Sequence, residues 1–447
     1  MMAGESGVAE VESSVFFRSK CWLRSSFSRL GRTPGYKWFL TLIDQALVSG
    51  TTFLASIIIG RTCEKEQLGL YLIGLSIIWF LTEWQGVIIW EPYTVFRHKF
   101  AGPSLALFTG STLIHQLTLS ALGIIALWGA GFCLSTGFGP PGLPGVIWVL
   151  VIASSFIAFR EYARRICFAN FQIGTALLLD LFAVAVQVGG LVLLASLGNL
   201  SASSALAALG LGSLLASFYW LLRARDSLAF SITHAVSDLG LNWSFGRWVL
   251  GGNMTLLLSI QFYPWALSAF HGTAAVGVLA ACQWVILVGP FLKGSGNFIG
   301  PRAAQAFARG GYGELRRFVA ISSLVIAIVI GLVCAAMICF GEQLLVFFYG
   351  PKYAGNSNVV SILALDTLVI GLAFSIDFGI WAMGRPDFNF KVNCVRMGIT
   401  LTLGLWLVMN YGPLGAAIGL LVGNIIAALL QYAFFARSNF HLSINEE

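Results

Sequence analysis

Three aspartates lie inside apolar runs long enough to cross a lipid bilayer, and they are the first candidates for chemistry. Asp44 lies in the run 38–60, and Asp366 and Asp377 lie in the run 358–383. Asp366 and Asp377 are eleven residues apart, about three helical turns, so both face the same side of a helix. Because an acid is costly inside a bilayer, we interpret these residues as candidates for a proton or sodium site. The alternative for Asp44 is an ion pair with a base near the membrane surface.

Four further polar residues extend this set of candidates for ion coupling or for the lining of a cavity. Asp180 and Gln187 are seven residues apart in one apolar run, so they share a helical face. Glu83 lies near the end of the second run, and His115 lies midway along the third. A histidine titrates near neutral pH, which suits a proton carrier, whereas the alternative is a hydrogen-bonded packing residue.

Five basic residues near the ends of apolar runs are candidates for contact with a phosphate group. They are Arg97, Arg160, Arg247, Lys293 and Arg302. Arginine binds phosphate through two parallel hydrogen bonds, and lysine binds it as a point charge. The alternative is that these residues only anchor the helices, because bases collect at the cytoplasmic ends of membrane helices.

The sequence contains no grouping typical of an enzyme or a metal site. It has no GxxxxGK[ST] phosphate loop, no nucleophile elbow, and eight cysteines without a CxxC pair. A disulfide between Cys63 and Cys133, which fall on the same predicted side, is left open. We therefore expect a transporter rather than an enzyme, with no cofactor apart from a coupling proton or sodium ion.

The composition places these residues in a membrane. Of 447 residues, 57% are hydrophobic and only 10% are charged, with a mean hydropathy of +0.84. The apolar runs are continuous rather than alternating, which favours helices over a membrane β-barrel. The sequence predicts an all-α polytopic membrane protein. Despite the net charge of +7 we expect no binding to nucleic acid, because the distribution of Lys and Arg along the chain, rather than their sum, matters here and reports orientation.

Twelve spans are expected, and Lys and Arg fall almost entirely on one side of them. The spans are 38–60, 68–90, 104–133, 146–165, 171–197, 205–222, 247–270, 274–299, 317–340, 358–383, 396–411 and 413–436. With the N-terminus inside, the outer segments hold only Arg61, Lys65 and Lys352. The positive-inside rule therefore predicts that both termini are cytoplasmic.

The longest break between spans divides the chain into two halves of six helices. We expect a basic N-terminal tail at 1–37, which is either an amphipathic surface helix or a plain basic tail. The N-lobe at 38–222, a cytoplasmic linker at 223–246, the C-lobe at 247–436 and a cytoplasmic tail at 437–447 follow.

The two halves carry a weak internal repeat. An offset of 208 residues places Gly69 on Gly277, each at the start of the helix that follows a short outer turn. An even number of spans separates the copies, so the repeat is parallel, about an axis along the membrane normal.

Four short motifs, in order along these spans, resemble a known family. They are Glu66–Tyr71, Phe347–Ala354, Ala382–Pro386 and Gly415–Gly419. The chain is similar over about residues 38–436 to the polysaccharide transporter and oligosaccharide-lipid flippase branch of the multidrug/oligosaccharidyl-lipid/polysaccharide exporter superfamily. The resemblance implies two six-helix lobes, alternating access, and export of a lipid-linked precursor of a polysaccharide such as lipopolysaccharide or exopolysaccharide.

The resemblance thus predicts a flippase of the inner (plasma) membrane for a polyprenyl-linked saccharide. Its partners would be the lipid-linked saccharide, the bilayer, and the polymerase and glycosyltransferases of the same pathway, with no nucleic acid. A drug/cation antiporter of the same superfamily is the alternative. A membrane glycosyltransferase or polymerase of the pathway is a further one, although the sequence shows neither the large outer loop nor the acid cluster expected of it.

Overall fold

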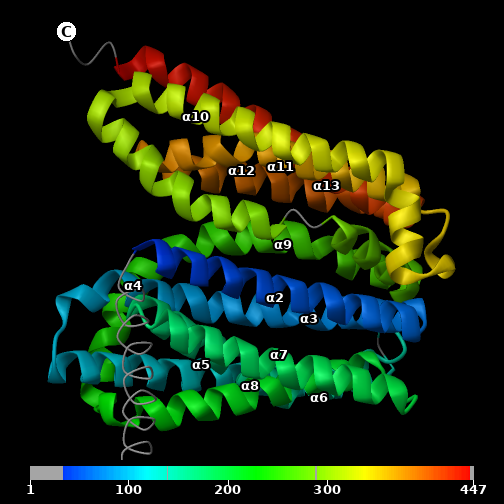
Figure 1. The fold of residues 1–447 in the computed structure, drawn as a ribbon, viewed down its shortest axis with the longest axis horizontal. Helices are drawn as coiled ribbons and strands as arrows, with labels where there is room; N and C mark the ends of the chain where they lie inside the picture. Colours follow the sequence, from blue (N-terminus) through cyan, green and yellow to red (C-terminus); the bar gives the residue numbers. More distant parts are fainter. Residues whose placement is uncertain (1–33, 138, 287–288, 443–447) are drawn as a thin grey trace, which may run out of the picture.

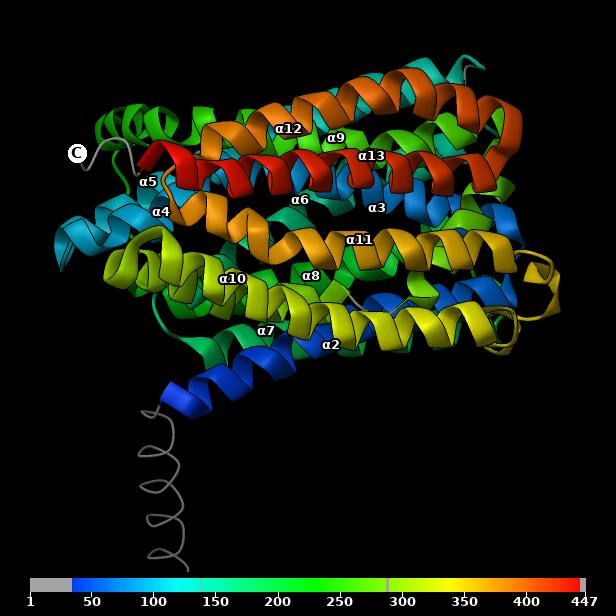
Figure 2. The ribbon, with the colours of Figure 1, turned by 90° about the horizontal axis from the view of Figure 1, so that it is seen from above.

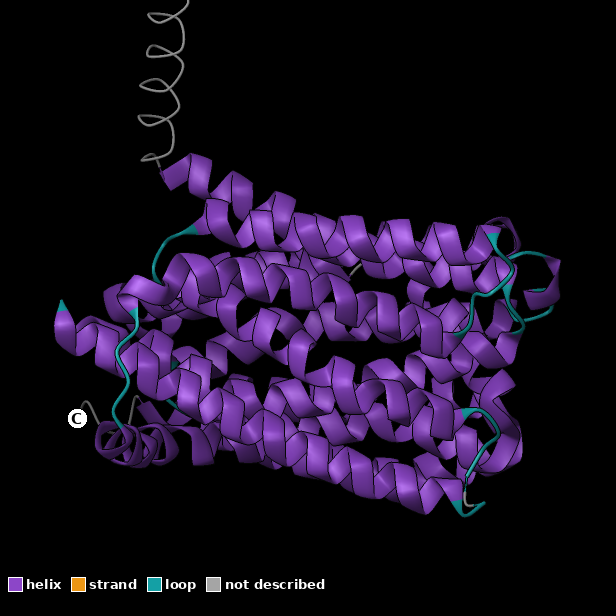
Figure 3. Ribbon diagram, turned by 90° about the horizontal axis from the view of Figure 1, so that it is seen from below, coloured by secondary structure: helices purple, strands orange, loops and turns teal. Residues whose placement is uncertain are grey.

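The computed structural model describes residues 34–442 apart from 138 and 287–288, and these residues are almost entirely helical (Figures 1 and 3). No strand occurs among them. The expected all-α polytopic class is therefore confirmed. Of the predicted tails, residues 1–33 and 443–447 lie outside the described part.

Twelve α-helices carry most of the described chain. They are α2 (Pro34–Thr62), α3 (Lys65–Gln85), α4 (Glu91–Phe96), α5 (Pro103–Ser135), α6 (Leu143–Ala169), α7 (Ile173–Ser196), α8 (Ala202–Ala224), α9 (Ile232–Val285), α10 (Gly289–Tyr349), α11 (Ser357–Ala382), α12 (Pro386–Ile399) and α13 (Leu405–Leu442). Two π-helical turns interrupt this series: η1 (Gly86–Trp90) precedes the short helix α4, and η5 (Thr400–Gly404) joins α12 to α13. Short 3-10 turns connect some of them, namely η2 (Arg97–Lys99), η3 (Arg225–Ser227) and η4 (Pro351–Tyr353).

The described chain has ten helical segments long and apolar enough to cross a membrane. Two of them, Phe298–Tyr349 and Pro386–Ser438, contain 52 and 53 residues, enough for two crossings each. Glycines with positive φ break the long helices at Gly272, Gly311 and Gly412. When the long helices are divided at these three glycines, the segments correspond to the twelve expected spans. In this count the stretch 273–310, which corresponds to the expected span 274–299, is one crossing.

The helices form two groups that follow each other along the sequence. Figure 1 shows α2 to α8 packed together below α9 to α13, and Figure 2 shows the helices of both groups running roughly along one axis. We call these groups the N-terminal half and the C-terminal half. We call the end of the bundle that holds the turns at 63–64 and 350–356 the predicted outer end.

The two halves cross at a reciprocal glycine contact near the predicted outer end. A methyl carbon added to Gly69 would lie 1.8 Å from the Thr273 carbonyl oxygen, and one added to Gly277 would lie 2.1 Å from the Lys65 carbonyl oxygen. The offset of 208 residues that relates Gly69 to Gly277 also relates Lys65 to Thr273. Each half therefore makes the same contact with the other, as expected for a parallel repeat whose axis passes between α3 and α9.

Two details differ from the sequence-based expectations. The predicted linker 223–246 is helical from Ile232 onward, because α9 begins there with Ser231 as its N-cap. The predicted eighth span is interrupted after Val285, where Ile286 leaves the helical conformation. Cys63 and Cys133 are both free, and the Cys63 thiol instead donates to the Leu200 carbonyl oxygen at 3.3 Å.

The crossing glycines lead to a first prediction. Gly69→Ala and Gly277→Ala should each destabilise the protein by about 1–3 kcal/mol, because the new methyl group meets backbone that cannot rotate away. The measurement is the thermal unfolding midpoint in detergent. Gly50→Ala is the matched control, since a methyl group there meets no atom within 4 Å. Equal midpoints for Gly69→Ala and Gly50→Ala would contradict the crossing.

Candidate functional site

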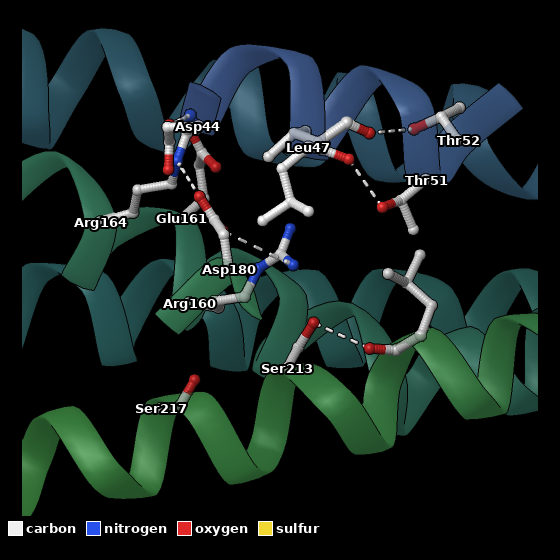
Figure 4. A network of polar contacts seen from close by, with 12 residues as sticks. Asp44, Leu47, Thr51, Thr52, Arg160, Glu161, Arg164, Asp180, Ser213 and Ser217 are labelled. Carbon is white, nitrogen blue, oxygen red and sulfur yellow. Dashed lines mark hydrogen bonds and ion pairs between the residues drawn. The ribbon is translucent and has the colours of Figure 1, made fainter. Parts of the chain in front are cut away.

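Arg164 lies between two buried carboxylates that come from different helices (Figure 4). Its Nη2 donates to Asp44 Oδ2 of α2 at 2.5 Å, and its Nε donates to Asp180 Oδ2 of α7 at 2.7 Å. Both aspartates are fully buried, and Arg164 is 8% exposed. One guanidinium thus ties α2, α6 and α7 together inside the N-terminal half.

Three more charges of α6 surround this centre. Glu161 Oε1 accepts from Arg165 Nε at 2.8 Å and from Arg164 Nη1 at 3.4 Å. Arg160 Nη1 lies 3.9 Å from Asp180 Oδ1. Arg160 and Arg164 are one helical turn apart and so share a face of α6. We call the whole set the buried ion cluster: Asp44, Arg160, Glu161, Arg164, Arg165 and Asp180.

The buried ion cluster changes the interpretation of Asp44. Its partner is Arg164, 120 residues away in the sequence, rather than a base near its own end of the helix. The cluster holds three acids and three bases, so its charges balance when all are ionised. Asp44 Oδ1 and Asp180 Oδ1 are nevertheless buried without a hydrogen-bond donor among the described residues. A proton or a small cation would find free oxygen lone pairs there.

The acids of the C-terminal half have neutral partners instead. Asn424 Nδ2 of α13 donates to Asp366 Oδ1 at 2.7 Å, and Gln431 Nε2 of the same helix donates to Asp377 Oδ1 at 3.0 Å. Arg396 of α12 lies within Coulombic range of both carboxylates, and its buried Nε has no hydrogen-bond partner among the described residues. We call Asp366, Asp377, Arg396, Asn424 and Gln431 the C-terminal polar cluster.

Glu83 and His115 contact parts of α9. Asn253 Nδ2 of α9 donates to Glu83 Oε1 at 2.8 Å, so this pair joins the two halves. His115 Nε2 lies 2.8 Å from the carbonyl oxygen of Ala235, while its buried Nδ1 has no partner among the described residues. The contact between His115 and Ala235 fits the alternative of a hydrogen-bonded packing residue. The Nδ1 atom of His115 is the ring nitrogen that a proton carrier would use.

Gln187 lies apart from the buried ion cluster, although it shares a helix face with Asp180. It hydrogen-bonds to the buried Tyr71 of α3. The Tyr71 ring in turn meets Trp284 of α9 edge-on, with ring centroids 6.2 Å apart. Gln187 therefore reaches the contact between the halves through one aromatic side chain, while Asp180 stays within its own half.

The predicted phosphate-contact residues do not converge on one site. Arg160 belongs to the buried ion cluster. Arg97 Nε donates to Asn170 Oδ1 at 2.7 Å, and the Arg302 guanidinium lies 4.0 Å from the centroid of the Phe298 ring. Arg247 is exposed on α9. Lys293 lies in α10, and its side chain is outside the described residues.

Basic side chains of one half bind backbone carbonyls of the other at the predicted outer end. Arg61, in the last turn of α2, donates through Nε to the Phe348 carbonyl at 2.9 Å and through Nη2 to the Phe347 carbonyl. Lys352, just beyond α10, donates to the Cys63 carbonyl. These contacts hold the two halves together at that end.

Comparison with known proteins identifies related sequences over part of the chain. No family model matches the sequence. The chain is 23% identical over 173 residues to the capsular polysaccharide biosynthesis protein CapF of Staphylococcus aureus, covering 38% of this chain and 43% of that protein. It is 26% identical over 195 residues to a "Putative O-antigen transporter" of Shigella flexneri, covering 43% and 46%. The chain thus spans less than half the length of the curated relatives it matches.

Solved structures show the same fold over nearly the whole chain. The inward-facing conformation of a multidrug resistance MATE family transporter of the MOP superfamily has a TM-score of 0.74 at 14% identity, over 90% of this chain and 96% of that one. The outward-facing conformation of such a transporter has a TM-score of 0.64 at 16% identity, over 93% and 98%. The resemblance to the polysaccharide-transporting branch of this superfamily is confirmed. The solved structures show that the chain has the fold of a multi-pass membrane transporter.

The buried ion cluster leads to a second prediction. Arg164→Gln leaves Asp44 and Asp180 buried without a guanidinium and should cost about 3–5 kcal/mol of stability. The double variant Asp44→Asn/Arg164→Gln should recover part of this loss, because it removes one uncompensated acid. Thermal unfolding midpoints in detergent measure both effects.

Arg165→Gln is the matched control for this series. Its side chain is 51% exposed, and exposed pairs contribute only about 0–1 kcal/mol. An Arg164→Gln midpoint equal to that of Arg165→Gln would show that the buried ion pairs of Arg164 contribute no more stability than the exposed pair of Arg165.

Proposed function

We propose that this protein is a flippase that moves a polyprenyl-linked saccharide across the inner membrane by alternating opening of its two halves. The observation that carries the proposal is the reciprocal glycine contact, which joins two halves of equal design at one end of the bundle. Such a contact lets the halves tilt about it while their internal packing is preserved. Both termini would lie in the cytoplasm, as the distribution of Lys and Arg predicts.

The contacts at the predicted outer end support a state closed toward that side. Arg61 and Lys352 bind carbonyls of the opposite half, and Ser56 Oγ lies 2.7 Å from Tyr349 Oη across the same contact. The higher TM-score with an inward-facing transporter than with an outward-facing one points the same way. Export would require these contacts to break as the outer end opens.

The names of the two relatives favour a saccharide substrate. One is a capsular polysaccharide biosynthesis protein and the other an O-antigen transporter. A lipid-linked precursor of such a polymer carries a phosphate-linked head group, and the glycosyltransferases and polymerase that make and use it would be partners of the protein. The described bases are spread over several helices, so we assign no single residue to the phosphate.

Ion coupling, where it occurs, fits the C-terminal polar cluster better than the buried ion cluster. Asp44 and Asp180 are already neutralised by Arg164, so protonating either one breaks an ion pair. Asp366 and Asp377 are held by neutral amides, which remain hydrogen-bonded to a protonated carboxyl group. Asp366 is therefore our leading candidate for a proton or sodium site.

A drug/cation antiporter is the second candidate function. The buried carboxylates Asp44, Asp180 and Asp366 and the fold shared with multidrug transporters favour it. An antiporter would bind an amphiphilic cation beside an acid, whereas a flippase would carry an anionic lipid-linked saccharide.

A transport assay separates the two functions and forms a third prediction. Protein reconstituted in liposomes should move a fluorescent polyprenyl-pyrophosphate-linked saccharide between leaflets at several times the rate of protein-free liposomes, measured by accessibility to an impermeant quencher. The same liposomes should accumulate no ethidium under an imposed proton or sodium gradient. Gradient-driven ethidium transport without movement of the lipid-linked saccharide would contradict the flippase proposal and support the antiporter.

The coupling site leads to a fourth prediction. Asp366→Asn should reduce transport at least tenfold while the amount of protein in the membrane stays normal, because the amide keeps the shape of the side chain but lacks the negative charge that takes up a proton or attracts a cation. Asp387→Asn is the control, since Asp387 is 48% exposed and pairs with Arg385 and Lys391. Normal transport by Asp366→Asn would exclude this residue from coupling.

A further inference from the structure

Arg396 is a positive charge inside a membrane-crossing segment, and it bonds to no other described residue. It belongs to α12 and to the apolar segment Pro386–Ser438. Its Nε is buried without a hydrogen-bond partner, and its guanidinium forms no ion pair in the described part of the chain. Burying a charge without a partner is costly. We therefore expect this guanidinium to have an anionic partner in another state of the protein.

Two acids of α11 lie on either side of Arg396 along the axis of the bundle. The turn between α11 and α12 contains Gly384. Counted from this glycine, Asp377 is seven residues away, Arg396 twelve and Asp366 eighteen. Both helices run roughly along one axis (Figure 2). At about 1.5 Å per residue, Arg396 lies about 18 Å from the turn, between Asp377 at about 10 Å and Asp366 at about 27 Å.

The Arg396 side chain passes α13 beside the amide that holds Asp366. A methyl carbon added to Gly423 of α13 would lie 3.5 Å from Arg396 Cγ, so this glycine faces the stem of the arginine. The next residue, Asn424, donates to Asp366 Oδ1 at 2.7 Å. Of the two acids, Asp366 also exerts the stronger Coulombic attraction on the guanidinium. A change of rotamer can therefore bring the guanidinium toward Asp366.

The C-terminal polar cluster is one positive charge short of balance. It contains two acids and one base, whereas the buried ion cluster contains three of each. The amides of Asn424 and Gln431 bind the carboxylates but add no charge. One proton or one sodium ion would therefore neutralise the cluster, and it would share the two carboxylates with Arg396.

We propose that Arg396 competes with the coupling cation for Asp366. The guanidinium pairs with the Asp366 carboxylate after the cation leaves, and it returns to its place between the two acids when a proton or a sodium ion binds. Asp366 thus has a positive partner in both states, so release of the cation does not leave a buried carboxylate unpaired. The inference rests on the coupling site proposed at Asp366, and it adds the residue that limits the affinity of that site.

The test measures cation binding by the whole chain in detergent, without any saccharide. In one arm, equilibrium dialysis at constant pH measures bound radioactive sodium. In the other arm, potentiometric titration in a sodium-free solution measures the protons taken up. The difference between the wild type and Asp366→Asn isolates the site, and the arm that shows this difference identifies the cation.

Three variants of arginine decide whether Arg396 competes with the cation. Arg396→Gln should lower the half-saturating cation concentration about tenfold or more, because it removes a competitor; a tenfold change corresponds to about 1.4 kcal/mol. Arg396→Lys keeps the charge and should restore most of the wild-type value. Arg385→Gln is the matched control and should bind like the wild type, because the Arg385 side chain is 53% exposed and pairs with Asp387. Since Arg396 has no bond to lose, Arg396→Gln should not lower the thermal unfolding midpoint.

The Asp366→Asn background separates this inference from the coupling site itself. In that background Arg396→Gln should not change cation binding, and a gain in affinity that persists there would overturn the assignment to Asp366. Binding that depends on Asp366 but has the same half-saturating concentration in the wild type and Arg396→Gln would overturn the inference without affecting the coupling site. Absence of such binding in both arms would contradict the coupling site and the inference together, whereas the flippase proposal depends on saccharide transport alone.

Discussion

The contact between Gly69 and Gly277 is the constraint on which the arrangement of the two halves depends. Backbone meets backbone there, at a distance that leaves no room for even a methyl group on either side. Such a contact contains no interdigitating side chains, so a small rotation of one half against the other costs little packing energy. The cation-to-carbonyl contacts of Arg61 and Lys352 lie at the same end and supply directional bonds that the glycine contact lacks. The glycine contact thus fixes where the two halves meet, and the few hydrogen bonds of Arg61 and Lys352 fix their relative orientation.

The two halves are related by the repeat, but their buried acids have different partners. In the N-terminal half, a guanidinium neutralises both acids, and this locks three helices together. In the C-terminal half, the acids accept from amides of α13, and the buried Nε of Arg396 has no hydrogen-bond partner in the part of the chain that the structure describes. An ion cluster resists a change of charge because each member depends on the others, whereas an acid held by an amide tolerates one. The buried charges of the N-terminal half therefore resist protonation more strongly than those of the C-terminal half.

Much of the fold follows from the sequence, and less of the site does. Continuous apolar runs, turn glycines and the placement of Lys and Arg predict the helices, and the offset of 208 residues aligns Gly69 with Gly277. The contact between these two glycines does not follow from the alignment, because equivalent positions of a repeat need not meet. The partner of Asp44 does not follow, because Arg164 lies 120 residues away and its position at a helix end also fits a membrane anchor. A signal was present nevertheless: Arg160 and Arg164 are one turn apart on one helix, and Asn424 and Gln431 share a face seven residues apart. Which helix each of these faces meets is set by tertiary packing, which a single sequence does not encode locally.

The bases on the predicted outer side have a structural reason to be there. The positive-inside rule disfavours Lys and Arg on that side, yet Arg61, Lys65 and Lys352 occur there. Arg61 and Lys352 each bind carbonyls near the C-terminal end of a helix in the opposite half, where backbone oxygens lack partners and carry partial negative charge. Lys65 lies 5.7 Å from the centre of the Tyr353 ring, again across the contact. All three of these bases therefore make contacts between the halves. The Lys and Arg residues that do not follow the positive-inside rule are thus the ones that close this end of the bundle.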